Sequence, residues 1–190
     1  MFGGANNIRS SFKKINWGRF KDAGPIPVNV SLSKGGVHII ASRALVYYAT
    51  HSAVALKFFD WLKKARAPDE AYFSTLNNSP HLGVPGAYLG GPDSPGNPFL
   101  ARVKNWAWMK EKCAGKFVRA ICVFGVGDLK ALASKKELFA NKFFSGFEPV
   151  AYACMEELLC NRTRDELSGA RVFNTSYYSQ FDFIKNHVKL

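Results

Sequence analysis

The stretch from Cys122 to Phe143, CVFGVGDLKALASKKELFANKF, decides how the second half of the sequence is expected to fold. It begins inside the apolar run VRAICVF, which is typical of a buried strand. Gly-Val-Gly-Asp then predicts a tight turn, and Asp128 is expected to cap the helical pattern that follows. One lysine, Lys142, stands near the end of the stretch. The pattern predicts a strand–turn–helix unit that lacks the full glycine fingerprint of a nucleotide-binding loop.

Helical patterns dominate the residues before this unit. Apolar residues recur with a helical period over 43–51, RALVYYATH, and over 52–65, SAVALKFFDWLKKA. Pro68 predicts the end of the second helix and suits the first turn of another, PDEAYFSTL. A short strand is predicted at 35–42, GGVHIIAS.

Glycine and proline organise the remaining segments. Many of them fall between Asn77 and Pro98, which predicts a long irregular loop. Pro149 suits the first turn of a helix over 148–160, EPVAYACMEELLC. The sequence contains no internal repeat, and residues 161–190 show no clear pattern.

The composition is that of a folded, basic chain. Its 190 residues carry a formal net charge of +12, and the pI is near 9.7, which favours anionic partners. The basic residues are scattered and no nucleic-acid-binding motif accompanies them, so we expect a solvated basic surface and no nucleic acid partner. No apolar run approaches the roughly 18 residues that cross a bilayer, and residues 1–20 lack the apolar middle of a signal peptide.

The four cysteines are Cys113, Cys122, Cys154 and Cys160, and their spacing is not that of a zinc site. Six residues of helix separate Cys154 from Cys160, a rise of about 9 Å that is too long for a disulfide. Cys113 and Cys122 bracket a short loop and can pair. If they do, the compartment is oxidising.

Residues 36–159 resemble glycosyltransferase family 14, the core-2/I-branching β-1,6-N-acetylglucosaminyltransferases. The matching blocks occur in family order with similar spacing: WLKKARAPDE, VPGAY, ARVKNWAW, VRAICVFGVGDL and LFANKF. The resemblance covers about two-thirds of this chain but only the C-terminal part of the family's catalytic domain. It implies that a nucleotide-binding half and a membrane anchor lie upstream of Met1.

The resemblance implies an α/β fold, the C-terminal portion of a glycosyltransferase-A-like domain with a mixed sheet flanked by helices. Three segments are expected: a basic, loop-rich segment over 1–35, the glycosyltransferase part over 36–160, and a C-terminal extension over 161–190.

The resemblance also implies a glycosyltransferase that inverts the anomeric centre without a metal, so we expect neither a metal site nor another cofactor. The sequence has no Asp-x-Asp motif, whose metal holds the diphosphate in most folds of this type. Positive side chains are then the means of neutralising the leaving diphosphate, and by resemblance they are Arg119 and Lys142. The alternative is a surface lysine and an arginine at a strand edge.

Glu70 matches the family's general base, which takes the proton from the acceptor's 6-hydroxyl. The alternative is that Asp69 and Glu70 only complement the dipole at a helix start. Trp106 and Trp108 correspond to acceptor-binding aromatics, although the family often has tyrosine at the second position. Two aromatics spaced by two on a strand are also typical of one packed face.

The predicted function is transfer of N-acetylglucosamine from UDP-N-acetylglucosamine to the 6-hydroxyl of an O-glycan-type acceptor, by a truncated chain. The alternatives are a peptide O-xylosyltransferase of the same family and a non-catalytic, carbohydrate-binding remnant. The resemblance also implies a disulfide between Cys113 and Cys122, and a lumenal Golgi location through an upstream membrane anchor. Four Asn-x-Ser/Thr sequons agree with a lumenal protein; they begin at Asn29, Asn77, Asn161 and Asn174.

Overall fold

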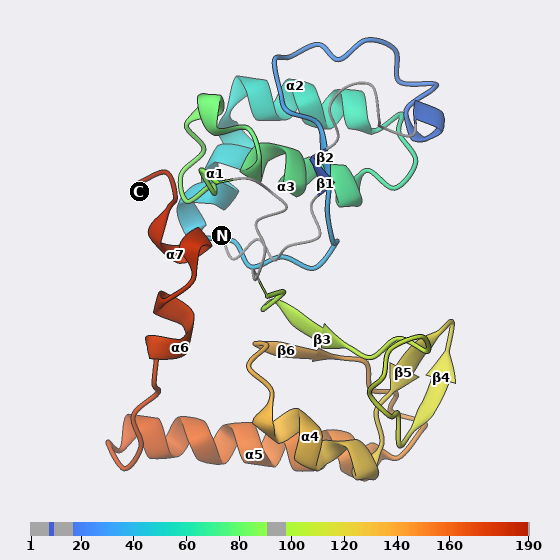
Figure 1. Ribbon diagram of the computed structural model, residues 1–190, viewed down its shortest axis with the longest axis vertical. Coiled ribbons are helices and arrows are strands. Elements are labelled where there is room, and N and C mark those ends of the chain that lie inside the picture. The colour runs from blue at the N-terminus through green and yellow to red at the C-terminus, as the bar shows by residue number, and fades with distance from the viewer. Residues whose placement is uncertain (1–7, 10–16, 91–97, 190) are drawn as a thin grey trace. The chain divides into compact units, whose positions relative to one another are not determined.

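The computed structural model describes residues 8–9, 17–90 and 98–189 (Figure 1). It confirms the predicted α/β class. The chain divides into two compact units, one formed by residues 1–101 and 176–190 and the other by residues 102–175. We describe each unit by itself. Among the described residues no helix is both long and apolar enough to cross a membrane.

Three of the helices described in the first unit form its main core: α1 (Arg43–His51), α2 (Ala53–Leu62) and α3 (Asp69–Asn77). All three lie where the apolar periodicity and Pro68 predict them. Ser42 caps α1, because its hydroxyl accepts a hydrogen bond from the backbone N–H of Leu45. The core between the helices is fully buried; it includes Leu45, Phe58, Leu62, Leu76 and Val84.

The strand predicted at 35–42 is wrong. The strand of this region is β2 (Ser33–Lys34), which pairs with β1 (Ile8–Arg9) and ends before Gly35. The N–H of Gly35 donates to the carbonyl of Glu70 in α3, 2.7 Å away, rather than to a neighbouring strand. Side chains of α3 also bind β2, since Ser33 donates its N–H to Thr75 Oγ1 and accepts from Ser74 Oγ. The end of β2 is therefore bound to a helix, and residues 36–42 continue without strand structure.

The irregular loop predicted between Asn77 and Pro98 is confirmed for the residues described there. Its regular part is the short 3-10 helix η2 (Pro80–Leu82); residues 91–97 lie outside the described residues. Two other 3-10 helices are η1 (Trp17–Arg19) and η3 (Val126–Asp128). Of the basic, loop-rich segment expected over 1–35, residues 1–7 and 10–16 lie outside the described residues.

The strands of the second unit pair in both directions. β3 (Arg102–Lys104) is parallel to β6 (Phe139–Asn141), whereas β4 (Lys116–Val118) and β5 (Ile121–Val123) form an antiparallel hairpin. These pairs are separate two-stranded sheets, linked by an isolated bridge between Trp106 and Ile121. The helices of this unit are α4 (Leu129–Ser134) and α5 (Pro149–Leu167).

Three details of the second unit differ from the sequence predictions. Arg119 lies in the turn of the hairpin with a φ of 51°, and not on the strand. Trp106 and Trp108 follow the end of β3 rather than lying along a strand. Helix α5 begins at Pro149 as predicted but runs on to Leu167, so the expected C-terminal extension starts as helix. The extension then forms α6 (Ser176–Ser179) and α7 (Asp182–Lys185), which belong to the first unit.

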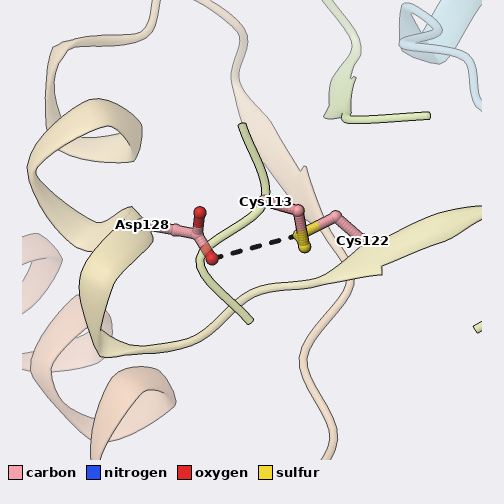
Figure 2. Close-up of side chains that lie close together, drawn as sticks. All are labelled: Cys113, Cys122 and Asp128. Carbon is pink, nitrogen blue, oxygen red and sulfur yellow. Dashed lines mark hydrogen bonds between the residues drawn. A yellow bond between two sulfur atoms is a disulfide. The ribbon is translucent and has the colours of Figure 1, made fainter. Parts of the chain in front are cut away.

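Asp128 holds the centre of the second unit together (Figure 2). It is buried, and its carboxylate accepts hydrogen bonds from the backbone N–H groups of Ala114, Gly115 and Gly125, at 2.8, 3.1 and 2.9 Å. The role differs from the predicted one, because the side chain does not cap α4; it closes the 3-10 turn and binds the loop before β4.

The disulfide between Cys113 and Cys122 lies beside this carboxylate (Figure 2). Asp128 Oδ2 is 3.9 Å from Cys122 Sγ; a disulfide sulfur has no proton to donate, so this is a contact without a donor. The pairing is the one that the family resemblance implies. Cys154 and Cys160 are free and exposed, and the helix α5 separates them as expected.

Gly127 is required by this packing. A Cβ at Gly127 would lie 2.7 Å from the Cβ of Ala114, closer than side chains pack. The glycine therefore lets η3 approach the loop that Asp128 binds, which agrees with the structural role predicted for the Gly-Val-Gly-Asp turn.

Asp128→Asn should destabilise the chain by roughly 1–3 kcal/mol, because an amide group replaces one accepting oxygen and leaves buried N–H groups unpaired. Urea unfolding of the oxidised chain measures the change. Glu148→Gln is the matched control, since Glu148 accepts from the Val126 N–H at an exposed site. It should cost no more than about 0.5 kcal/mol. Equal unfolding curves for Asp128→Asn and the unchanged chain would contradict this role.

Candidate functional site

Glu70 stands in the first turn of α3, where its backbone is fixed from two sides. Its carbonyl accepts hydrogen bonds from the Gly35 N–H at 2.7 Å and from Ser74 Oγ at 2.9 Å. Its N–H donates to Asp69 Oδ1 at 3.1 Å. The helix start that Pro68 predicts is therefore present, and the backbone of Glu70 is fixed in its first turn.

The carboxylate of Glu70 forms ion pairs with two basic side chains. Arg19 Nη1 donates to Oε2, and Lys34 Nζ lies 3.6 Å from the same oxygen. The side chain of Glu70 remains 30% exposed, so it is both held and open to solvent. The hydrogen bond from Arg19 is the main reason that the pKa of Glu70 lies below its ordinary value; partial burial opposes this effect, and the charge of Lys34 adds to it.

The sequence analysis missed Arg19 and Lys34. They come from η1 and β2, and Arg19 is 51 residues from Glu70 in the chain. No local spacing links them to Glu70, so only the folded chain brings them together. This arrangement is suited both to a purely structural ion pair and to an ionised catalytic base. The two roles differ in whether the second carboxylate oxygen of Glu70, Oε1, binds a substrate hydroxyl.

Arg119 and Lys142 lie at opposite ends of β5. Arg119 is exposed in the hairpin turn that precedes β5. Lys142 is half-buried; its carbonyl accepts from the N–H of Phe124, just after β5, and its Nζ lies 5.3 Å from the ring centre of Phe144. Their convergence on one diphosphate stays a prediction.

Trp106 and Trp108 form a stacked pair. Their ring centres are 4.8 Å apart and their planes differ by 18°. Trp106 is half-buried, bridges Ile121, and has Lys104 Nζ 5.8 Å from its ring centre, whereas Trp108 is 71% exposed. The pair is thus an aromatic surface with an open outer ring, rather than part of a buried core.

The predicted site residues divide between the two units. Glu70 belongs to the first unit, and the two cations and the two tryptophans belong to the second. Whether they line one site stays a prediction.

Two other features do not involve the predicted site residues. Cys113, Cys122 and Asp128 gather within 4.8 Å, but both sulfurs are used in the disulfide, so they offer no thiolate to a metal. A groove of about 750 Å³ lies along α1, and its walls are mostly apolar and aromatic. It is lined by Ser42, Arg43, Ala44, Tyr47, Tyr48, His51, Ser52 and Pro85.

Comparison with known proteins places these residues in a family. The family described as Core-2/I-Branching enzyme matches residues 5–133, which is more than half of the chain and includes Glu70, Trp106, Trp108 and Arg119. Lys142 lies beyond the matched residues. The resemblance read from the sequence is thereby confirmed.

Curated relatives agree with this match. The N-acetyllactosaminide β-1,6-N-acetylglucosaminyl-transferase of Mus musculus is 33% identical over 145 residues, which are 75% of this chain and 35% of the relative. The human protein of the same name is 31% identical over 157 residues, 81% of this chain and 37% of the relative. The β-1,3-galactosyl-O-glycosyl-glycoprotein β-1,6-N-acetylglucosaminyltransferase 4 of Mus musculus is 30% identical over 146 residues, 74% of this chain and 32% of the relative. The chain spans about a third of the length of these relatives.

Arg19→Gln should cost roughly 0.2–1 kcal/mol of unfolding free energy at neutral pH, because the ion pair with Glu70 is partly exposed. The pKa of Glu70 is lower in the folded chain than its ordinary value, so the pair stabilises the fold above that ordinary value. The contribution is lost as the pH falls through the lowered pKa. Urea unfolding from neutral pH down to about pH 3 should therefore show the difference between the two chains disappearing.

The double variant with Arg19→Gln and Glu70→Gln controls for other effects of the substitutions. It should be no more pH-dependent than Glu70→Gln alone, since the titrating partner is absent in both. A cost of Arg19→Gln that stays constant over this pH range would mean that the ion pair with Glu70 is not its cause.

Proposed function

The chain belongs to the core-2/I-branching enzyme family, and from that premise we propose that it takes part in glycosyl transfer. The proposed reaction moves N-acetylglucosamine from UDP-N-acetylglucosamine to the 6-hydroxyl of an O-glycan-type acceptor, with inversion and without a metal. One observation carries the proposal: the carboxylate of Glu70, in a family block, is held ionised at a fixed helix start and is still open to solvent.

Glu70 acts as the general base in this reaction. The acceptor oxygen attacks the anomeric carbon, its proton passes to the carboxylate, and UDP leaves with the electron pair of the broken bond. Both ion pairs of Glu70 use Oε2, so Oε1 is the oxygen that we assign to the acceptor hydroxyl. Arg19 and Lys34 orient the carboxylate and keep it ionised. They also weaken its basicity, so it accepts the proton only as the attack develops.

Arg119 and Lys142 neutralise the negative charge that builds on the diphosphate as the glycosidic bond breaks. What supports their role is their position in family blocks and the half-buried setting of Lys142, where a charge acts with less screening than in water. The donor is therefore expected to need no metal. UDP-N-acetylglucosamine is favoured over UDP-xylose because the relatives are named as N-acetylglucosaminyltransferases.

The stacked Trp106 and Trp108 offer the apolar face of an acceptor sugar a flat, exposed ring. The proposed location is the Golgi lumen, in agreement with the disulfide, which persists in oxidising compartments.

Glu70→Gln should lower kcat by roughly 10²–10⁴ while the affinity for UDP-N-acetylglucosamine hardly changes, because the substitution keeps the shape and removes the basicity. The assay uses the chain itself and a chimaera in which the chain replaces the matching third of the mouse N-acetyllactosaminide enzyme. Asp69→Asn is the matched control, since Asp69 is the adjacent carboxylate, is exposed and forms neither ion pair; it should cost far less.

Wild-type turnover by Glu70→Gln would remove Glu70 from the chemistry. A folded, oxidised chain and chimaera that bind glycans without transferring any sugar would favour the carbohydrate-binding remnant. Transfer from UDP-xylose alone would favour the xylosyltransferase.

Lys142→Ala should lower kcat by roughly 10²–10³, by analogy with the removal of one oxyanion-hole donor, and the transfer should proceed in EDTA. Lys136→Ala is a control for net charge, since Lys136 lies outside the matched blocks. If EDTA abolished the activity and manganese restored it, the proposed role of Arg119 and Lys142 would be contradicted.

A further inference from the structure

The folded chain separates its four Asn-x-Ser/Thr sequons into two kinds. Asn29 and Asn174 are exposed and lie in segments without helix or strand, whereas Asn77 is buried and Asn161 lies inside a helix. We propose that Asn29 and Asn174 are the N-glycan acceptors of this chain and that Asn77 and Asn161 carry no glycan. The inference rests on the proposed lumenal location, because N-glycans are attached there.

The Asn29 sequon presents its carboxamide on an anchored loop. The Asn29 carbonyl lies 2.9 Å from His81 Nε2, and the N–H of Ser31 donates to Ser79 Oγ at 2.9 Å. Between them Val30 is buried, so the backbone is fixed from below while the Asn29 side chain faces solvent. An exposed loop is the setting that a bulky glycan needs.

All three residues of the Asn77 sequon are buried. Asn77 is 2% exposed, and its Oδ1 accepts from the N–H of Tyr88 at 3.2 Å. Asn78 is buried and donates to the carbonyl of Ser74, and Ser79 is fully buried with its hydroxyl accepting from Ser31. A glycan on Asn77 would have to displace this core, because a folded interior has no room for a sugar.

The remaining two sequons differ in the same way. Asn161 is half-buried within α5, and its Oδ1 accepts from Arg164 Nη2 at 2.9 Å. Asn174, Thr175 and Ser176 are all exposed, and Asn174 and Thr175 precede α6.

The modification is a simple substitution at the anomeric carbon of a lipid-linked oligosaccharide. The carboxamide Nδ2 forms the new bond to that carbon and loses one proton, and the lipid diphosphate leaves with the electrons of the broken C–O bond. No oxidant or reductant takes part.

The test is glycopeptide mapping of the chain directed into microsomes by an added signal sequence. Glycans are removed with peptide N-glycosidase in heavy-oxygen water, which converts each glycosylated asparagine into labelled aspartate. In the soluble, disulfide-bonded fraction we expect the label at Asn29 and Asn174 and ordinary asparagine at Asn77 and Asn161. The readout needs no transferase activity, so it stands or falls separately from the proposed function.

A matched pair of variants tests the Asn29 site without touching its anchors. Ser31→Ala removes the hydroxyl that the sequon requires but keeps the backbone N–H that binds Ser79, and it should abolish the glycan on Asn29. Ser31→Thr should retain it. Label at Asn77 or Asn161 in the folded fraction would overturn the proposal, and an unlabelled Asn29 or Asn174 would overturn the assignment of that residue.

Discussion

The buried carboxylate of Asp128 fixes the geometry on which the second unit depends. Its two oxygens satisfy three backbone N–H groups from two segments, the loop that carries Cys113 and the turn that follows β5. Charge-assisted bonds of this kind are short and strong, and they are stronger still where water is excluded. The disulfide joins the same loop covalently to β5, the strand that leads into this turn. The hairpin turn with Arg119 and the segment with Lys142 are both held, through β5, by this one cluster.

Glu70 has a similar place in the first unit. Its backbone carbonyl ties α3 to the end of β2, and its carboxylate ties α3 to η1 through Arg19. The same residue therefore organises the fold and, in the proposed function, takes the acceptor's proton. The geometry explains how one carboxylate can do both, since the ion pairs use Oε2 and the proposed chemistry uses Oε1.

Local signals in the sequence were sufficient for the helices and insufficient for the long-range pairings. Periodicity predicted α1 and α2, because each of these helices buries one face. Pro68 predicted the start of α3, whose residues from Ala71 to Asn77 are mostly buried on all sides. The end of α5 could not be predicted, since that helix buries little beyond Ala151 and its last turns are polar. The error at 35–42 and the missed Arg19 share one cause: α3, far along the chain, supplies their partners. The predicted site residues came from matched family blocks. Such blocks give the residue types and their order along the chain, but not the distances between the side chains in the folded protein.

The most direct test of the account is the stereochemistry and linkage of the product. Nuclear magnetic resonance of the sugar transferred from α-configured UDP-N-acetylglucosamine to an O-glycan acceptor reports both, for the chain or for the chimaera that contains it. A single displacement assisted by Glu70 predicts a β-linked N-acetylglucosamine on the acceptor's C6 oxygen. An α-linked product, or a sugar attached to another hydroxyl, would contradict it.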